Sequence, residues 1–183
     1  MGGAAPEPAA AAADGVQVLV VRAGGRTCAI PLASVVETMR SLPARPIAGV
    51  PPYVLGVALV RGEPLPVVDV ERLLGGEAAP RLVPAAPGFA RGERAGRLVT
   101  VRAGGARRVA LALDEVAGVR TVDRLACAAL APLLGGAAAG AVAGLGALDR
   151  ELLAVLDASR LLEDAGFAAV DAAAADVAPE ATP

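Results

Sequence analysis

The hydrophobic positions of this chain fall into short runs rather than long periodic stretches. Short strand-like runs occupy residues 17–22 (QVLVVR), 27–30 (TCAI) and 35–40 (VVETMR), and each is followed within two residues by Gly, Pro or a polar residue. Short apolar runs rich in β-branched residues and bounded by turn formers are typical of β-strands. Four prolines between residues 43 and 52 predict an extended connector rather than a central strand. The pattern therefore predicts a β-rich chain.

The clearest local pattern is the stretch GVALVRGEPLPVVD at residues 56–69. Two apolar runs flank the charged residues Arg61 and Glu63, with Gly62 between them. Because glycine adopts positive φ without steric cost, a tight reversal at Gly62 is favourable. We therefore predict a β-hairpin with Arg61 at its tip, followed by a short helical turn at residues 70–74. A guanidinium on a rigid turn is a candidate recognition group.

The two halves of the chain share one pattern, which indicates an internal duplication. Residues 56–74 align with residues 144–162 without a gap, and the sequence VRAGG occurs in both halves. Charged residues match in register as well as apolar ones, so chance similarity of low-complexity sequence does not explain the repeat. Matched pairs are Val21/Val101, Ala29/Ala110, Val35/Val116, Gly56/Gly144, Glu63/Glu151, Leu65/Leu153, Val67/Val155, Asp69/Asp157, Arg72/Arg160, Leu73/Leu161 and Leu74/Leu162.

The duplication predicts two β-rich units with the same strand order, at about residues 16–75 and 96–165. Several short strands with Gly turns suggest small barrels, which close on themselves and leave no open edge. Each unit is near the lower size limit for an independent core, so we expect the two to pack together, and exchange of strands between them is left open. Asp157 is a candidate N-cap of a short helix at residues 157–164.

Three segments lack a strand or helix pattern. Residues 1–15 and 166–183 are rich in alanine, and we expect them to be a disordered leader and a disordered tail. Residues 75–95 are rich in Ala, Pro, Gly and Arg, which predicts a loop between the two units.

Composition narrows the function classes. Hydrophobic residues make up 55% of the 183 residues but aromatic residues only 2%, so the core must consist of Val, Leu, Ile and Ala. A net charge of −2 argues against nucleic-acid binding, which favours a basic surface. No apolar run reaches the roughly 18 residues of a membrane span, and the start of the chain lacks the basic segment of a secretory signal. We therefore expect a cytoplasmic protein that neither binds nucleic acid nor inserts into a membrane.

The residues available for chemistry are few. The sequence contains no histidine and no lysine, which excludes histidine-based triads, histidine metal sites and a P-loop. The two cysteines, Cys28 and Cys127, are far apart and have no metal or redox spacing. Their apolar surroundings favour buried free thiols. A small Cys-dependent enzyme is the alternative, and it requires an accessible thiol of low pKa. We predict no catalytic, cofactor or metal site.

Taken in order, these motifs resemble the CheW-like coupling domains of bacterial chemotaxis. The family's Gly-Val strand, Arg-Gly turn and Pro-Val-x-Asp strand correspond to GVALVRGEPLPVVDV at residues 56–70. Its preceding Val-x-Glu strand corresponds to residues 35–37, and its terminal Gly-Leu-Gly pattern to GLGALDRELLAVLD at residues 144–157. The resemblance runs from about residue 17 to residue 162. One departure is Leu59, where the family usually has Asn.

The resemblance implies an all-β fold of two packed five-stranded SH3-like barrels with a short C-terminal helix. It also implies a non-catalytic adaptor that joins methyl-accepting chemoreceptors to the histidine kinase CheA. Carried over by position, the receptor-facing residues are Val35, Glu37, Arg61 and Gly62. A CheW-like scaffold of a non-flagellar chemosensory pathway is the alternative function.

Simpler structural roles compete with these assignments. Arg61 could be a solvated turn charge or form a salt bridge with Glu63 or Glu37, and Glu37 could be a solvent-facing carboxylate. Asp69 and Asp157 occur at matched positions, which favours helix capping over chemistry for both. An Asn at position 59 would fix the turn by side-chain hydrogen bonds, whereas Leu59 cannot.

Overall fold

The computed structural model describes residues 15–75, 96–123, 140–148 and 151–175. Within these ranges the chain forms ten β-strands in two five-stranded sheets, which confirms the predicted all-β architecture. The elements are β1 (Gly15–Ala23), β2 (Arg26–Pro31), the 3₁₀ turn η1 (Leu32–Ser34), β3 (Val35–Arg40), β4 (Val54–Val60), β5 (Glu63–Asp69), α1 (Val70–Leu73), β6 (Arg97–Arg102), β7 (Arg108–Leu113), β8 (Glu115–Asp123), β9 (Val142–Leu148), β10 (Glu151–Leu156), the 3₁₀ turn η4 (Ala158–Arg160) and α3 (Asp164–Ala175).

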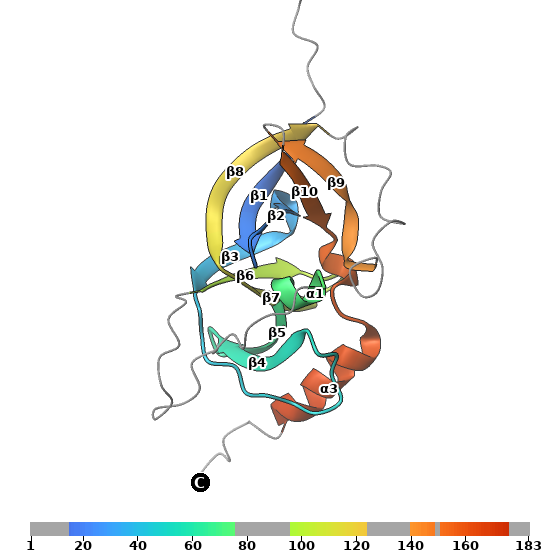
Figure 1. Ribbon diagram of the computed structural model, residues 1–183. Coiled ribbons are helices and arrows are strands. Elements are labelled where there is room, and N and C mark those ends of the chain that lie inside the picture. Colours follow the sequence, from blue (N-terminus) through green and yellow to red (C-terminus); the bar gives the residue numbers. More distant parts are fainter. Residues whose placement is uncertain (1–14, 76–95, 124–139, 149–150, 176–183) are drawn as a thin grey trace, which may run out of the picture.

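Each sheet curls into a small barrel, and the two barrels stack on each other (Figure 1). Barrel A has the strand order β8-β1-β2-β10-β9, and its outer strands β8 and β9 contact each other. Barrel B has the order β3-β6-β7-β5-β4. The connector after β3 closes it, because Arg45 and Val57 exchange backbone hydrogen bonds of 2.7 and 2.8 Å.

The two repeats exchange strands reciprocally. β3, β4 and β5 of the first repeat join β6 and β7 of the second, while β8, β9 and β10 join β1 and β2. Of the exchanged strands, β5 and β10 pair in parallel, with Val67 opposite Ala110 in barrel B and Val155 opposite Ala29 in barrel A, whereas β3 and β8 pair antiparallel with β6 and β1. These are the same positions of the two repeats, so the duplication is also a structural one. Neither sheet therefore follows the boundaries of the expected units, residues 16–75 and 96–165.

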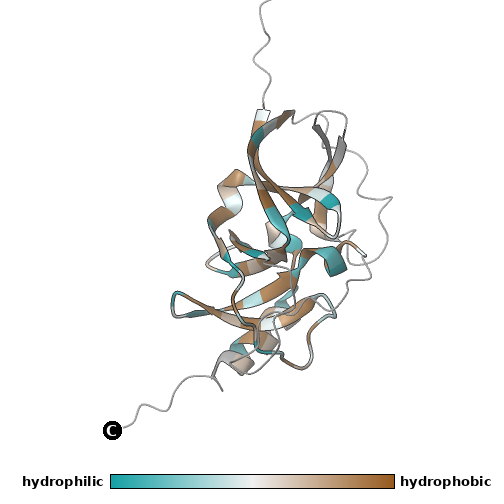
Figure 2. Cartoon of the chain, turned by 60° about the vertical axis from the view of Figure 1, so that its left-hand side comes forward, coloured by the Kyte–Doolittle hydropathy of each residue, from teal (hydrophilic) through white to brown (hydrophobic). Residues whose placement is uncertain are grey.

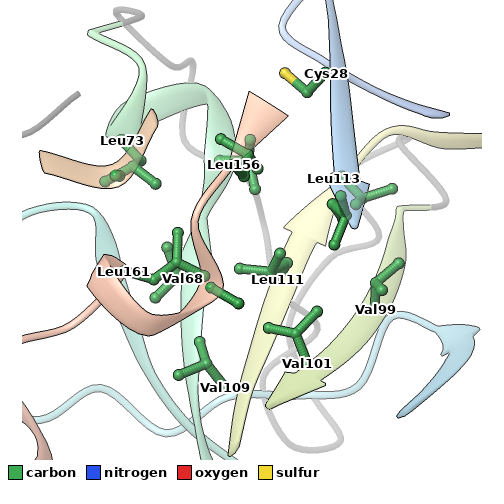
Figure 3. Close-up of a cluster of buried hydrophobic side chains, with 14 of the residues drawn as sticks. Cys28, Val68, Leu73, Val99, Val101, Val109, Leu111, Leu113, Leu156 and Leu161 are labelled. Atoms are coloured by element: carbon green, nitrogen blue, oxygen red, sulfur yellow. The ribbon is translucent and has the colours of Figure 1, made fainter. Parts of the chain in front are cut away.

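A hydrophobic core between the barrels holds them together (Figure 3). Along β1, Leu19 and Val21 enter this shared core, whereas Val18 and Val20 fill the interior of barrel A. Both faces of the strand are buried, which explains the continuous apolar run in place of an alternating one. The shared core includes Cys28, Ile30, Val68, Val99, Val101, Leu111, Leu113, Leu156 and Leu161.

The interiors of the barrels are lined partly by small residues. Ala58, Ala110 and Ala112 lie inside barrel B together with Leu65 and Leu98. Small side chains fit a five-stranded barrel because little space remains at its centre. Figure 2 shows hydrophobic colouring along most strands and hydrophilic colouring mainly at strand ends and turns. Packing inside the barrels therefore accounts for part of the high alanine content of the chain.

Asp69 and Asp157 are the predicted helix caps. The Asp69 carboxylate accepts hydrogen bonds from the backbone N–H groups of Glu71 and Arg72, at 3.0 and 3.3 Å. The Asp157 carboxylate accepts one from the backbone N–H of Ser159 at 3.0 Å. Both predictions are confirmed, although the element after Asp157 is a 3₁₀ turn rather than a helix reaching residue 164.

The C-terminal region differs from the expectation of a disordered tail from residue 166. Helix α3 continues to Ala175 and contacts β4 and β5 of barrel B. Phe167 and Val170 are buried, and the Arg107 guanidinium lies 4.7 Å from the centroid of the Phe167 ring. Arg107 also forms an ion pair with Asp164 at the start of the helix. These tertiary contacts stabilise an alanine-rich helix that the sequence pattern alone did not indicate.

Candidate functional site

The tip of the β4–β5 hairpin is a two-residue turn formed by Arg61 and Gly62. Their φ angles are 50° and 87°, and positive φ at both central residues defines a type I′ turn. Arg61 is the only non-glycine residue with positive φ among the residues described. A side chain in this conformation costs roughly 1–2 kcal/mol relative to ordinary backbone. The hairpin therefore presents a guanidinium at a position where glycine, asparagine or aspartate is favoured.

Arg61 forms an ion pair with Glu37 on β3. Its Nε lies 3.0 and 2.8 Å from the two Glu37 carboxylate oxygens, and its Nη2 lies 2.7 Å from Oε2. The guanidinium side chain remains 79% exposed, whereas that of Glu37 is 22% exposed. One of the competing structural roles of Arg61 is therefore realised. The geometry holds the exposed guanidinium in a defined place, with Glu37 as its support.

A β-bulge in β3 sets the direction of Glu37. The register shifts between Val35, which is opposite Val101, and Glu37, which is opposite Thr100. Directly opposed residues share a face, so Glu37 lies on the face of the buried Thr100. Val35 packs against the core between the barrels instead. Simple strand alternation would place Val35 and Glu37 on one face, but the bulge adds a residue to the alternation and puts them on opposite faces.

The structure thus brings together three of the four predicted site residues. Arg61, Gly62 and Glu37 form one surface at the hairpin tip, whereas Val35 contributes to the shared core from the other side of β3.

The base of the hairpin is fixed by Gly56. Its φ is 138°, and a Cβ at this position would lie 2.0 Å from the backbone oxygen of Arg45. No side chain fits there, so glycine permits the close approach that closes barrel B. The strand leading to Arg61 is anchored by the bonds between Arg45 and Val57.

A second ion pair flanks the hairpin. Glu63 begins β5 and binds Arg108 at the start of β7, with an Nη1–Oε2 distance of 3.0 Å. Because Glu63 is engaged there, Arg61 pairs with Glu37 and not with its neighbour in sequence. The Arg108 side chain is 45% exposed, so this second pair also lies on the surface.

Leu59 adds an apolar side chain beside this charged turn. It is 63% exposed, and the only other exposed large hydrophobic residue in the described ranges is Val119 at 45%. The sequence marked Leu59 only as a departure from the resembled family. Its exposure could have been inferred from strand alternation, because Ala58 and Val60 on either side point into barrel B.

The one described cysteine has the properties of a core residue. Cys28 is a free thiol in the core between the barrels, and its burial raises its pKa from 9.0 to about 11, with a smaller opposing effect of Arg26 (Figure 3). A protonated, inaccessible thiol is a poor nucleophile. Cys127 lies outside the described residues. Within those residues there is also no cluster of His, Cys, Asp and Glu suited to a metal ion.

The fold defines a class: a double β-barrel domain that carries an exposed ion pair at the tip of one hairpin. The family of CheW-like domains matches residues 17–166, and the chain belongs to that family. The crystal structure of the scaffolding protein TtCheW from Thermoanaerobacter tengcongensis has the same fold, with a TM-score of 0.65 at 18% identity, covering 83% of this chain and 95% of that chain. Among curated proteins, none matches the sequence. None of the described helices is long and apolar enough to cross a membrane.

Proposed function

We propose that this protein is a non-catalytic cytoplasmic adaptor that couples methyl-accepting chemoreceptors to a CheA-type histidine kinase. Membership of the CheW-like domain family supports this class of function. The observation that carries the receptor-binding assignment is the Arg61–Glu37 pair, in which a 79% exposed guanidinium is held on a rigid turn.

The geometry of the pair leaves part of Arg61 available for a partner. Its Nε and Nη2 face Glu37, whereas Nη1 has no partner among the described residues. A guanidinium carries five N–H donors in a fixed plane, so its free edge can donate to a carboxylate or carbonyl of a second chain. Glu37 fixes the orientation of that edge, which reduces the entropy lost on binding.

The adaptor acts through contacts and not through bond chemistry. Coupling requires that the contacts with a receptor differ between its signalling states, because a ligand shifts an equilibrium only by its differential affinity. One continuous hydrophobic core joins the two barrels. Because close-packed interiors have low compressibility and transmit strain, a change at the Arg61 surface can reach a partner bound elsewhere on the protein.

The test is a pull-down with purified CheA-type kinase and a receptor signalling-tip fragment. The wild type should retain both proteins, and Arg61→Ala should lose the receptor fragment while circular dichroism remains native. Arg160→Ala is the matched control, since it removes another exposed, ion-paired arginine that lies in η4 and outside the β4–β5 hairpin, and it should bind like the wild type. Equal losses in both variants would mean a general charge effect, and a folded wild type that binds neither protein would refute the proposed function.

A further inference from the structure

Leu59 lies on the outer surface of the β4–β5 hairpin. In the register of the hairpin it is directly opposite Pro64, which is also exposed. Directly opposed residues of antiparallel strands point to the same side, so the two side chains form one small apolar surface. Arg61 follows two residues later and closes the hairpin. An exposed leucine thus stands beside an exposed guanidinium whose position is fixed.

The duplicated hairpin provides an internal comparison. Val60 and Leu65 enter barrel B, and the matched positions of the second repeat are also apolar in sequence, as Leu148 and Leu153. The exposed residues of the first hairpin have no equivalent of the same type in the second repeat, since Leu59 matches Ala147 and Arg61 matches Asp149 in sequence. Folding requirements alone account for the apolar residues at the inner positions. They do not require a leucine at an outer position of one hairpin only.

We propose that Leu59 is a specificity-determining contact for a partner helix, which places an aliphatic side chain on Leu59 and a carboxylate on Arg61. This inference rests on the proposed function. Leu59 is the second-last residue of β4 and Arg61 the first residue of the turn, so chain connectivity keeps their Cα atoms within about 7 Å. Residues three or four apart on a helix have their Cβ atoms about 5–6 Å apart. One helical turn therefore spans the step from Leu59 to Arg61, with the acidic residue one turn from the aliphatic one.

The chemistry of the surface formed by Leu59, Pro64 and Arg61 favours a helix with these two side chains over other partners. Arg61 has an exposed cationic edge, which complements a carboxylate. Leu59 and Pro64 offer no hydrogen-bonding side chain, so a purely polar segment would be desolvated against them without compensation. A partner helix that carries both groups satisfies both parts of the surface.

The experiment measures binding of the purified receptor signalling-tip fragment by titration calorimetry. Removing most of the leucine side chain in Leu59→Ala should weaken binding about tenfold, and Leu59→Asn should weaken it at least as much. Leu59→Ile retains the apolar area and should bind like the wild type. Val119→Ala is the matched control, because Val119 is the other exposed large hydrophobic residue in the described ranges and belongs to barrel A.

The outcomes separate this inference from the proposed function. Weakened binding in Leu59→Ala and Leu59→Asn, with unchanged binding in the other two variants, supports the contact. Wild-type affinity in Leu59→Ala, while Arg61→Ala loses binding, overturns the Leu59 assignment and leaves the proposed function intact. If the wild type does not bind the receptor fragment, both the Leu59 assignment and the proposed function are refuted. Thermal unfolding of each variant checks that the fold is kept, which is expected for a substitution at an exposed site.

Discussion

Arg61 and Glu37 connect the two outer strands of barrel B. Glu37 lies in β3 and Arg61 directly follows β4, and these strands stand at opposite ends of the sheet order. The distance of 2.7 Å between Nη2 and Oε2 therefore bridges the seam at which the barrel closes. Backbone bonds between Arg45 and Val57 bridge the same seam farther along β4. The candidate recognition residue is thus also part of the closure of its barrel.

The variant Arg61→Asn should separate recognition from stability. Asparagine followed by glycine is a preferred sequence for a type I′ turn, so the substitution stabilises the turn itself. This gain offsets the loss of the ion pair, which is worth about 0.2–1 kcal/mol. We expect the free energy of unfolding to stay within about 1 kcal/mol of the wild type, while receptor binding is lost. Urea denaturation and a pull-down measure the two quantities. A loss of more than about 2 kcal/mol would contradict the assigned turn geometry.

The variant Gly56→Ala should strongly destabilise the protein. Its Cβ would lie 2.0 Å from the Arg45 oxygen, and the φ of 138° is unfavourable for alanine. We expect a loss of about 3 kcal/mol or more, because backbone must move at the seam. Gly25→Ala is the control: its φ is 75° but nothing lies within 4 Å of the added Cβ, so the loss should be about 1 kcal/mol. Similar losses in both would show that steric contact at Arg45 is not decisive.

The two capping aspartates should differ in their contribution to stability. Asp69 is fully buried and accepts two backbone hydrogen bonds, whereas the side chain of Asp157 is 27% exposed and accepts one. We expect Asp69→Ala to cost about 2 kcal/mol and Asp157→Ala about 1 kcal/mol. Chemical denaturation of both variants tests the order. Asp69→Asn should recover most of the loss, since its side-chain oxygen can still accept.

The Cys28 thiol predicts a loss of stability at alkaline pH. Its pKa is about 11 in the folded protein and near 9.0 when exposed, so between these values the unfolded state releases a proton that the folded state retains. Folding stability should therefore fall as pH rises from 9 toward 11. Urea titrations across this range, with Cys28→Ala as reference in a Cys127→Ser background, measure the difference in slope. Rapid reaction of native Cys28 with a thiol reagent at pH 8 would argue against its burial.

Features set by neighbouring residues could be predicted from the sequence. The strand at residues 35–40, the hairpin around Gly62 and the Asp69 cap all depend on interactions within a few positions, and the structure has them. Helix α3 depends instead on Arg107, more than fifty residues away, which its own alanine-rich sequence does not indicate. The exchange of strands likewise rests on pairs such as Val67 and Ala110.

The candidate site likewise combines features that the local sequence predicts with features that depend on distant residues. The positive φ of Gly62 follows from residue type, whereas the placement of Glu37 requires the bulge after Val35. A bulge inserts one residue without a specific sequence signal, so counting alternate positions would place Val35 and Glu37 on the same face. Pairing between Arg61 and Glu37 was one of two options with Glu63, and the competing contact of Arg108 with Glu63 decides between them.

The order of strands also bears on how the protein is made. Every strand of barrel B lies between residues 35 and 113, whereas barrel A combines residues 15–31 with residues 115–156. A ribosome therefore completes the barrel that carries Arg61 while β1 and β2 still lack β8, β9 and β10. We expect nascent chains to form barrel B first and to assemble barrel A around it, since domains commonly fold in the order of their synthesis. The first strands to emerge would then be among the last to find their neighbours.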